Sequence, residues 1–377
     1  MDIYVVKAGD SIDGIAAAYG IAPERLAYDN QIPYPYALAV GQALLIPYEE
    51  EEGSVPLRVN GYAYPFIQQQ ILEETLPYLT TLSVFSYGFT LEGELLYPQI
   101  DDTNMLETAR VFGVEAVLTL TPFDETGKFN NNYIHVLVNN EEVIDRLLSE
   151  LLQVMTEKGY GGVDIDFEFI LPEDRVPFAE FVETTRIFMN NNGYSVSVAL
   201  APKTSANQPG LLYEGKDYKL LGEAANSVLL MTYEWGYTYG PPMAVAPLPN
   251  VRKVVEYAVT EIPVEKIDLG IPNYGYDWPL PFQRGVTAAT TIGNRQAVEI
   301  AIAYGAEIQY DTTAQAPYFF YQDSYGIQHE VWFEDVRSML AKFNLIKEFN
   351  LRGCGYWQIM RLFRANWLLL QEEFLIV

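Results

Sequence analysis

The chain has 377 residues, of which 49% are hydrophobic and 14% aromatic, and its formal net charge is −27 at neutral pH. This length and composition indicate a folded protein with one large and one small domain, and they exclude a disordered chain. The acidic surface argues against binding to nucleic acid or to a membrane of anionic lipid, whereas the many aromatic rings suit a neutral or carbohydrate ligand.

No targeting segment or disulfide framework is expected. Residues 1–4 do not begin a basic region followed by an apolar run, so the sequence predicts no Sec-type signal peptide. No stretch approaches the ~18 apolar residues that a membrane-spanning helix needs. The single cysteine, Cys354, excludes an internal disulfide, and its Gly-Cys-Gly setting predicts a small buried thiol in a strand.

Residues 1–48 are expected to form a small βααβ unit. Strands are predicted at 3–6 and 40–47, with helices at 12–19 and from Pro23 to about Tyr28. The segments Tyr-x-Val-x-x-Gly-Asp-Ser and Gly-Gln-x-Leu-x-Ile-Pro at its two ends resemble those of a LysM module. LysM modules bind glycans that contain N-acetylglucosamine, in a groove between two loops. The residues that this resemblance places in the groove are Gly9, Asp10, Ser11, Ile12, Asn30, Gln31 and Ile32. Ordinary turn chemistry is an equally good interpretation of each one.

The acidic run at 49–53 reads as a solvated linker, so a domain boundary is predicted there. The remainder, 54–377, contains eight strand-like runs separated by helical stretches, which predicts an α/β fold of the TIM (β/α)8 barrel type. A small α/β insertion is expected between strands 7 and 8 at about 280–331, with a helix at 296–304 and a strand at 318–321. The eight runs are 57–62, 81–87, 116–120, 162–169, 195–201, 227–233, 267–273 and 354–358.

The fourth run carries the acids around which the chain is organised. Asp164, Asp166 and Glu168 alternate with apolar residues, so they share one face of a strand, while the apolar residues face an adjacent helix. In a buried parallel sheet three neighbouring carboxylates are costly unless some are protonated or hydrogen-bonded. A solvated acidic strand is the alternative. We interpret the pattern as a proton-sharing relay that ends in a general acid.

This Asp-x-Asp-x-Glu pattern after a glycine-rich entry resembles the catalytic strand of glycoside hydrolase family 18. The full family pattern is Asp-x-x-Asp-x-Asp-x-Glu, and here Gly161 replaces its first Asp. The sixth run ends in Met-Thr-Tyr-Glu, similar to the family's Met-x-Tyr-Asp, with Glu234 in place of Asp. Segments around Tyr310, His329 and Arg352 resemble the spore cortex-lytic, SleL/YaaH-like branch of N-acetylglucosaminidases.

The resemblance implies a retaining mechanism in which the substrate's own acetamido oxygen attacks. Glu168 would protonate the leaving oxygen and then activate water, and Asp166 would hold the acetamido N–H. Asp164 would share a proton with Asp166, since two neighbouring acids cannot both ionise easily. Tyr233 would hydrogen-bond the acetamido oxygen. Further expected substrate contacts are Trp357, Glu234, Tyr62, Trp235, Tyr276 and Trp278. Core packing is an equally good interpretation of Tyr62, Trp235, Tyr276 and Trp278. His135 and His329 have no matched ligands, so no metal site and no cofactor are expected.

Together these features predict a glycoside hydrolase that cleaves after N-acetylglucosamine in peptidoglycan, in spore cortex or its fragments. A chitinase and a non-catalytic lectin that binds chitin or peptidoglycan are the alternatives, although such lectins have usually lost the catalytic acid, which Glu168 retains here. The expected partner is an N-acetylglucosamine-containing glycan, and a monomer is expected. The resemblance implies association with the cortex or coat of a spore in a spore-forming bacterium, otherwise a cytoplasmic or cell-wall location.

Overall fold

The computed structural model describes residues 2–47, 53–123, 126 and 128–377. The acidic run predicted as a linker falls mostly at 49–52, outside the described residues. The N-terminal unit has the expected order, with β1 (Asp2–Val5), α1 (Ile12–Tyr19), α2 (Pro23–Asp29) and β2 (Ala43–Ile46). Strands β1 and β2 pair antiparallel, and α1 begins at the Ser11 cap and ends at Gly20 in the left-handed conformation.

Eight parallel strands in the described part of the chain close a barrel, because β3 pairs with both β16 and β4. The eight strand-like runs of the sequence are these strands, so the predicted TIM-barrel fold is confirmed. They are β3 (Pro56–Ala63), β4 (Thr81–Phe89), β6 (Glu115–Leu120), β7 (Gly162–Ile165), β8 (Ser195–Leu200), β9 (Ser227–Leu230), β10 (Ile267–Pro272) and β16 (Gly353–Trp357).

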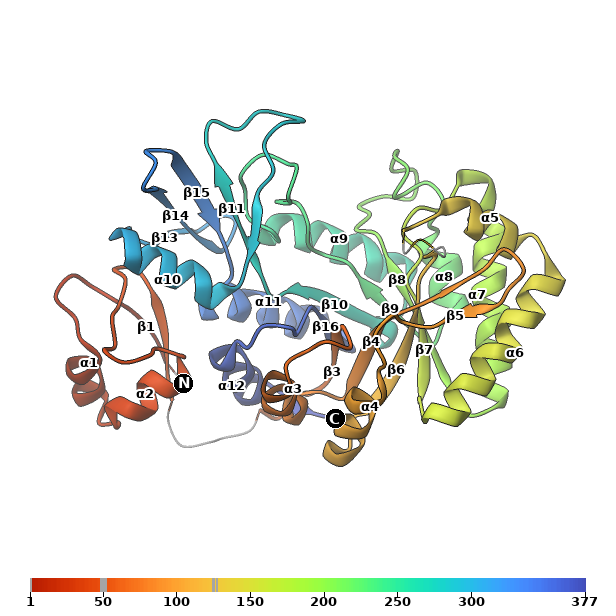
Figure 1. Ribbon diagram of the computed structural model, residues 1–377, viewed down its shortest axis with the longest axis horizontal. Helices are drawn as coiled ribbons and strands as arrows, with labels where there is room; N and C mark the ends of the chain where they lie inside the picture. Colours follow the sequence, from red (N-terminus) through yellow and green to blue (C-terminus); the bar gives the residue numbers. More distant parts are fainter. Residues whose placement is uncertain (1, 48–52, 124–125, 127) are drawn as a thin grey trace.

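Helices surround the barrel, and Figure 1 shows most of them on its outer side. They are α3 (Gln69–Thr75), α4 (Thr103–Phe112), α5 (Asn131–Val138), α6 (Glu141–Lys158), α7 (Arg175–Asn191), α8 (Tyr218–Ala224), α9 (Leu248–Glu261), α11 (Val336–Phe349) and α12 (Arg364–Glu373). Short elements complete the set: β5 (Leu95–Leu96), β17 (Leu375–Ile376) and the 3-10 turns η1 (Leu76–Tyr78), η2 (Pro172–Asp174) and η3 (Val264–Lys266).

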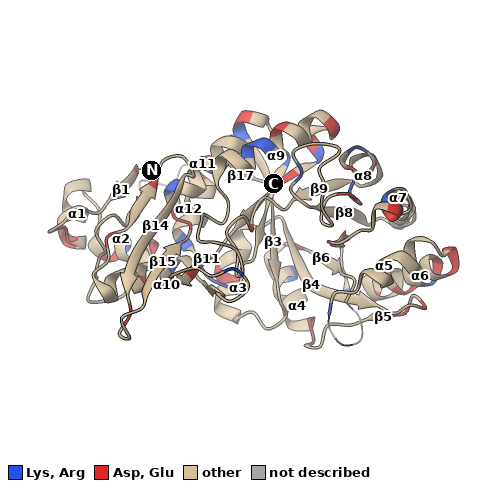
Figure 2. Cartoon of the chain, turned by 90° about the horizontal axis from the view of Figure 1, so that it is seen from above, with Lys and Arg blue, Asp and Glu red and all other residues tan. Residues whose placement is uncertain are grey.

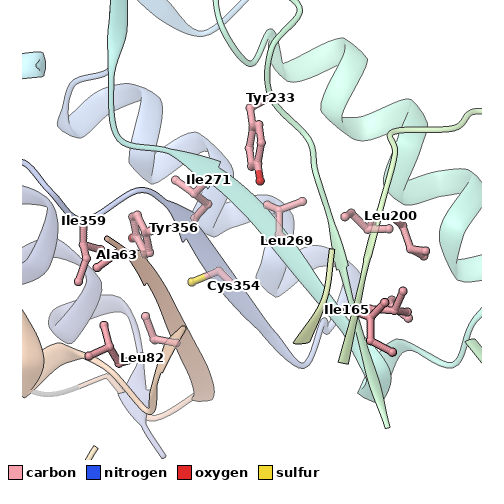
Figure 3. Close-up of a cluster of buried hydrophobic side chains, with 14 of the residues drawn as sticks. Ala63, Leu82, Ile165, Leu200, Tyr233, Leu269, Ile271, Cys354, Tyr356 and Ile359 are labelled. Carbon is pink, nitrogen blue, oxygen red and sulfur yellow. The ribbon is translucent and has the colours of Figure 1, made fainter. Parts of the chain in front are cut away.

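Apolar side chains from neighbouring strands fill the layer between the barrel and the surrounding helices. Figure 3 shows Leu82, Leu200, Leu269 and Cys354 in this cluster. Cys354 is fully buried, as its sequence setting predicts. On the outer side of β7, Phe167 stacks on the rings of Phe178 and Phe181 from α7. The layer of apolar residues between the three acids therefore lies under a helix, as expected.

The insertion between β10 and β16 forms a five-stranded antiparallel sheet in the order β12-β11-β15-β14-β13, within a fully described segment. Its first strand begins at Gly275, earlier than the position near 280 that the sequence suggests. The elements are β11 (Gly275–Pro279), β12 (Thr290–Ile292), α10 (Asn294–Tyr304), β13 (Gln309–Asp311), β14 (Ala316–Gln322) and β15 (Gln328–Trp332).

The N-terminal unit packs against the insertion and against α11 and α12 (Figure 1). The Arg364 guanidinium lies 3.9 Å from the centre of the Tyr28 ring and donates to the Tyr28 carbonyl at 2.7 Å. The Ile308 amide donates to the Val40 carbonyl at 2.9 Å. A Cβ at Gly41 would lie 1.8 Å from the Ile308 carbonyl oxygen, so only glycine permits this approach. The unit is thus held against the rest of the chain by direct contacts.

Acidic residues are spread over the outer helices, α6 and α7 among them (Figure 2). This distribution accounts for the large negative charge without concentrating it in one cluster. Among the described residues, no helix combines the length and the apolar character that crossing a bilayer requires.

Candidate active site

The three acids lie where β7 ends at the mouth of the barrel. The strand itself stops at Ile165, earlier than the predicted run, opposite Leu120, where the neighbouring strand β6 ends. The Asp166 amide still donates to the Leu120 carbonyl at 2.9 Å, and the chain then leaves the sheet. Glu168 consequently projects from a loop segment directly above the strand, which is the usual place for catalytic groups in this fold.

Asp164 is the deepest of the three, with 1% of its surface exposed. It accepts hydrogen bonds from the Tyr62 hydroxyl of β3 at 2.8 Å and from the Ser197 hydroxyl of β8 at 2.5 Å. Burial raises the pKa of the Asp164 carboxyl, while the two hydroxyl donors act in the opposite direction. Its two oxygens are therefore engaged inside the barrel, with no role left in touching a substrate.

Asp166 is 7% exposed, and its Oδ1 has no hydrogen-bond partner among the described residues. Burial raises the pKa of this carboxyl well above its usual value, and the charges of Glu168 and Asp164 raise it further. An unsatisfied buried polar atom costs about 1–3 kcal/mol. Such a cost is tolerated where a ligand supplies the missing partner, so Asp166 is suited to hold a polar group of a substrate.

Glu168 lines a cavity of about 170 Å³ together with Tyr213, Tyr233 and Trp235. Burial raises the pKa of the Glu168 carboxyl. A raised pKa keeps a carboxyl protonated closer to neutral pH, which is what a general acid requires. The geometry and the electrostatics of this cavity therefore fit proton donation to a bound ligand.

Tyr233 lies at the mouth of the barrel, and Figure 3 shows its hydroxyl directed towards the apolar cluster below it. Burial raises the pKa of this hydroxyl well above its usual value, so it stays a neutral hydrogen-bond donor. The next residue, Glu234, has a positive φ of 68°. Its Oε1 accepts a hydrogen bond from Tyr276 at 2.9 Å and a second one from Tyr274. Two buried tyrosines thus fix the orientation of the Glu234 carboxyl.

Trp357 ends β16 inside an aromatic cluster. Its ring centre lies 4.9 Å from that of Phe85, 5.8 Å from that of Tyr62 and 6.2 Å from that of Tyr64. Phe85 and Tyr64 also line an open groove of about 470 Å³ beside the acids, whose rim carries the exposed Phe66. Aromatic faces of this kind are the surfaces on which sugar rings pack.

Comparison with known proteins agrees with this geometry. Residues 126–361 match the family described as glycosyl hydrolases family 18, and residues 4–47 match the LysM domain. The cortical fragment-lytic enzyme of Bacillus subtilis is 38% identical over 429 aligned positions, which cover 100% of this chain and 99% of that protein.

The chain belongs to glycoside hydrolase family 18. The crystal structure of the Bacillus cereus spore cortex-lytic enzyme SleL superposes on it with a TM-score of 0.83 at 35% identity, covering 100% of this chain and 87% of that one. A chitinase from Chromobacterium violaceum shares the fold, with a TM-score of 0.76 at 22% identity, covering 84% of this chain and 98% of that one.

Gly161, where the family 18 pattern has an Asp, lies against the side chain of Glu115 on β6. A Cβ at this position would lie 2.4 Å from the Cγ of Glu115, so the Glu115 side chain occupies the space that a larger residue would need. An Asp at position 161 therefore requires Glu115 to move.

Three aromatic residues expected at the family 18 cleft are placed beneath its surface. Trp278 is 0% exposed and donates from its indole Nε1 to the Gly240 carbonyl at 2.9 Å, so it cannot contact a substrate in this conformation. Tyr62 and Tyr276 are also buried, and act through their hydrogen bonds to Asp164 and Glu234. Trp235, in contrast, lines the cavity that contains Glu168.

Most of the expected LysM groove residues have structural contacts of their own. The side chains of Ile12 and Ile32 belong to the core of the module. The side-chain amide of Asn30 donates from Nδ2 to the backbone carbonyls of Leu26 and Leu45. Its Oδ1 accepts from the backbone N–H of Leu45, so this side chain is not free to bind a glycan. Polar contacts hold the others in place: Asp10 accepts from Tyr4 and Lys7, Ser11 caps α1, Gly9 makes a turn at φ 90°, and Gln31 accepts from the Arg364 amide.

The sequence does not single out Lys216, which the structure brings to the acids. Its ammonium group is fully buried and donates to the Ala199 carbonyl at 2.7 Å. The approach depends on Gly215, where a Cβ would lie 2.2 Å from the carbonyl oxygen of Ile170, just after Glu168. A second buried lysine, Lys203, donates to the Lys216 carbonyl at 2.7 Å and fixes this loop.

Lys216 and the acids act on each other electrostatically. Burial lowers the pKa of Lys216 to about 8, against the opposing effect of the three carboxyl groups. Burial raises the pKa of Asp164, Asp166 and Glu168. The Lys216 charge acts in the opposite direction and lowers the pKa of all three carboxyl groups. In the described part of the chain, His, Cys, Asp and Glu side chains form no group of three or more that could hold a metal ion.

Proposed function

We propose that this chain hydrolyses the glycosidic bond after N-acetylglucosamine in peptidoglycan, in spore cortex or in fragments released from it. One observation carries the proposal. Beside Tyr233, Asp166 has an oxygen without a hydrogen-bond partner among the described residues, and Glu168 has a raised pKa. The proposal is supported by the likeness over the full chain to enzymes named for cortex and cortical fragments. The same relatives support an association with the spore.

The proposed mechanism has no covalent enzyme nucleophile. Glu168 protonates the leaving oxygen while the acetamido carbonyl oxygen of the substrate attacks the anomeric carbon and displaces it, forming an oxazolinium ion. Asp166 accepts a hydrogen bond from the acetamido N–H through its free oxygen, and the Tyr233 hydroxyl donates to the acetamido oxygen. Glu168, now ionised, takes a proton from water, whose oxygen attacks the anomeric carbon and opens the ring. Asp164 can share a proton with Asp166 as the charge on the substrate changes.

In this mechanism Trp357 packs under the sugar at the scissile bond, and Trp235 and Glu234, which line the cavity with Glu168, contact it as well. The aromatic groove beside Trp357 extends the cleft along the glycan. Glu234 is suited to orient a substrate because Tyr274 and Tyr276 already hold its carboxyl in place.

Mass spectrometry of the products tests this function. The purified protein is expected to release fragments ending in N-acetylglucosamine from spore peptidoglycan, and Glu168→Gln is the matched control for contaminating enzymes. A protein that degrades chitin but leaves peptidoglycan intact would identify a chitinase. Binding to either polymer without any product would identify a lectin. Both results would contradict the proposal.

A further inference from the structure

A second groove, of about 560 Å³, lies where three parts of the chain meet. The LysM module contributes Gln31, the barrel contributes Gln70 of α3 and Arg361 of the segment after β16, and the insertion contributes Gln296 of α10. Asn273, at the end of β10, donates to the Arg361 carbonyl at 2.9 Å and to the Gln358 carbonyl at 3.1 Å. These bonds fix the segment that carries Arg361, only four positions after Trp357.

The charges of this groove are paired with one exception. Glu74 forms an ion pair with Arg364, and Glu299 pairs with Arg295 at 2.8 Å. The Arg361 guanidinium makes no hydrogen bond or ion pair with any described residue, although the residue is partly buried. Acidic residues outnumber basic ones 50 to 23 in this chain. The donors of this guanidinium are therefore available to an external anion.

The surroundings of Arg361 leave its guanidinium open to the groove. A Cβ at Gly293 would lie 2.7 Å from the Cδ of Arg361, so glycine makes room for the aliphatic part of the side chain. The amides of Gln31, Gln70 and Gln296 line the same space and can bind uncharged polar groups. A planar guanidinium matches a carboxylate through two parallel hydrogen bonds.

We propose that this groove binds a carboxylate-bearing side group of a peptidoglycan strand, the lactyl or peptide carboxylate of a muramic acid residue, through Arg361. The proposal rests on the function proposed above and names the feature of the substrate that separates peptidoglycan from chitin, since chitin carries no carboxylate. The LysM module contributes Gln31 to this groove, so the module, the barrel and the insertion bind the glycan strand together.

Isothermal titration calorimetry tests the proposal with two probes, an N-acetylglucosamine–N-acetylmuramic acid tetrapeptide and N-acetylchitotetraose. Every protein carries Glu168→Gln, so that neither probe is cleaved. Loss of a charge-assisted hydrogen-bonded contact is expected to weaken binding of the muropeptide by about 10- to 100-fold in Arg361→Gln. Binding of the neutral chitotetraose is expected to be unchanged, and Arg361→Lys is expected to lie between Arg361→Gln and the parent.

The control Arg295→Gln removes the same charge from the same groove but from a residue that already has a partner. An equal loss in both variants would show a general effect of charge and would overturn the site. The same conclusion follows if Arg361→Gln binds the muropeptide as tightly as the parent, or if the parent does not bind it. Failure of the proposed function is a separate result, namely that the unmodified protein cleaves no peptidoglycan while the binding depends on Arg361.

Discussion

Replacing Lys216 by methionine removes a buried positive charge while keeping a side chain of similar length. The Lys216 charge lowers the pKa of Asp166 and Glu168, so both values are expected to rise in the variant. For unit charges on the order of 5–10 Å apart at an effective dielectric constant of ~20, Coulomb's law gives about 2–3 kcal/mol. That energy corresponds to about 1–2 pKa units.

The readout is the pH dependence of kcat/KM on a soluble glycan fragment. Glu168 must be protonated to act as an acid, so activity is lost as the pH rises through its pKa. The alkaline limb of the profile is therefore expected to move about 1–2 units towards higher pH in Lys216→Met. A role confined to packing would lower activity without moving this limb.

Stability provides a second readout with a defined sign. The pKa of Lys216 is lowered from 10.5 to about 8 in the folded protein, so between these values the unfolded chain binds more protons than the folded one. The free energy of unfolding of the unmodified protein is then expected to gain up to about 3 kcal/mol from this group as the pH rises from 8 to 10.5. Lys216→Met is expected to lack that gain, which chemical denaturation of both proteins at several pH values would measure.

Lys342 provides the matched control because it is equally buried but pairs with Glu334 at 2.8 Å, away from the acids. Lys342→Met is expected to destabilise the fold by about 3–5 kcal/mol, as breaking a buried pair does, and to leave the alkaline limb in place. An unmoved limb in Lys216→Met, or the same displacement in both variants, would refute the electrostatic role.

Three further predictions concern the acid, its support and the module. Glu168→Gln is expected to lower kcat by about 10²–10⁴ while a pull-down on insoluble glycan stays unchanged, and undiminished turnover would overturn the assignment of the acid. Tyr62→Phe removes one of the two donors to Asp164, so kcat is expected to fall by about tenfold in steady-state assays, less than for Glu168→Gln; an unchanged kcat would show that this bond is dispensable. Deleting residues 1–48 is expected to leave a folded barrel with a lower Tm, because the module's contacts with Arg364 and Ile308 are lost. Cleavage of small soluble fragments should persist, whereas binding to insoluble peptidoglycan should weaken. Complete loss of soluble-substrate activity would place the module within the active site.

The barrel could be predicted from the sequence because each of its strands is a short apolar run flanked by helical stretches. The acids of β7 could be found for the same reason, since alternation on a strand places Asp164, Asp166 and Glu168 on one face. Local pattern did not show where the strand ends, because β7 ends beside the last residue of β6, a partner distant in sequence.

Features that depend on distant partners could not be read from the chain. Lys216 lies in an ordinary polar loop by sequence, and contacts with distant residues, the packing of Gly215 on Ile170 and the hydrogen bond from Lys203, hold it near the acids. For Trp278 the sequence leaves a substrate contact and core packing equally open, and β11 carries it into the insertion, where it is buried. The docking of the LysM module on Arg364 joins residues more than three hundred positions apart, which no local pattern reveals.

The configuration of the first-formed product tests the central claim most directly. Proton NMR of a glycan being cleaved in real time distinguishes the two anomers before they interconvert. The acetamido oxygen and then water each invert the anomeric carbon, so the account predicts retention, together with no cleavage of a substrate whose acetamido group is a free amine. An inverted product, or rapid cleavage of the de-acetylated substrate, would contradict the substrate-assisted role of Asp166 and Tyr233 even if Glu168 proved essential.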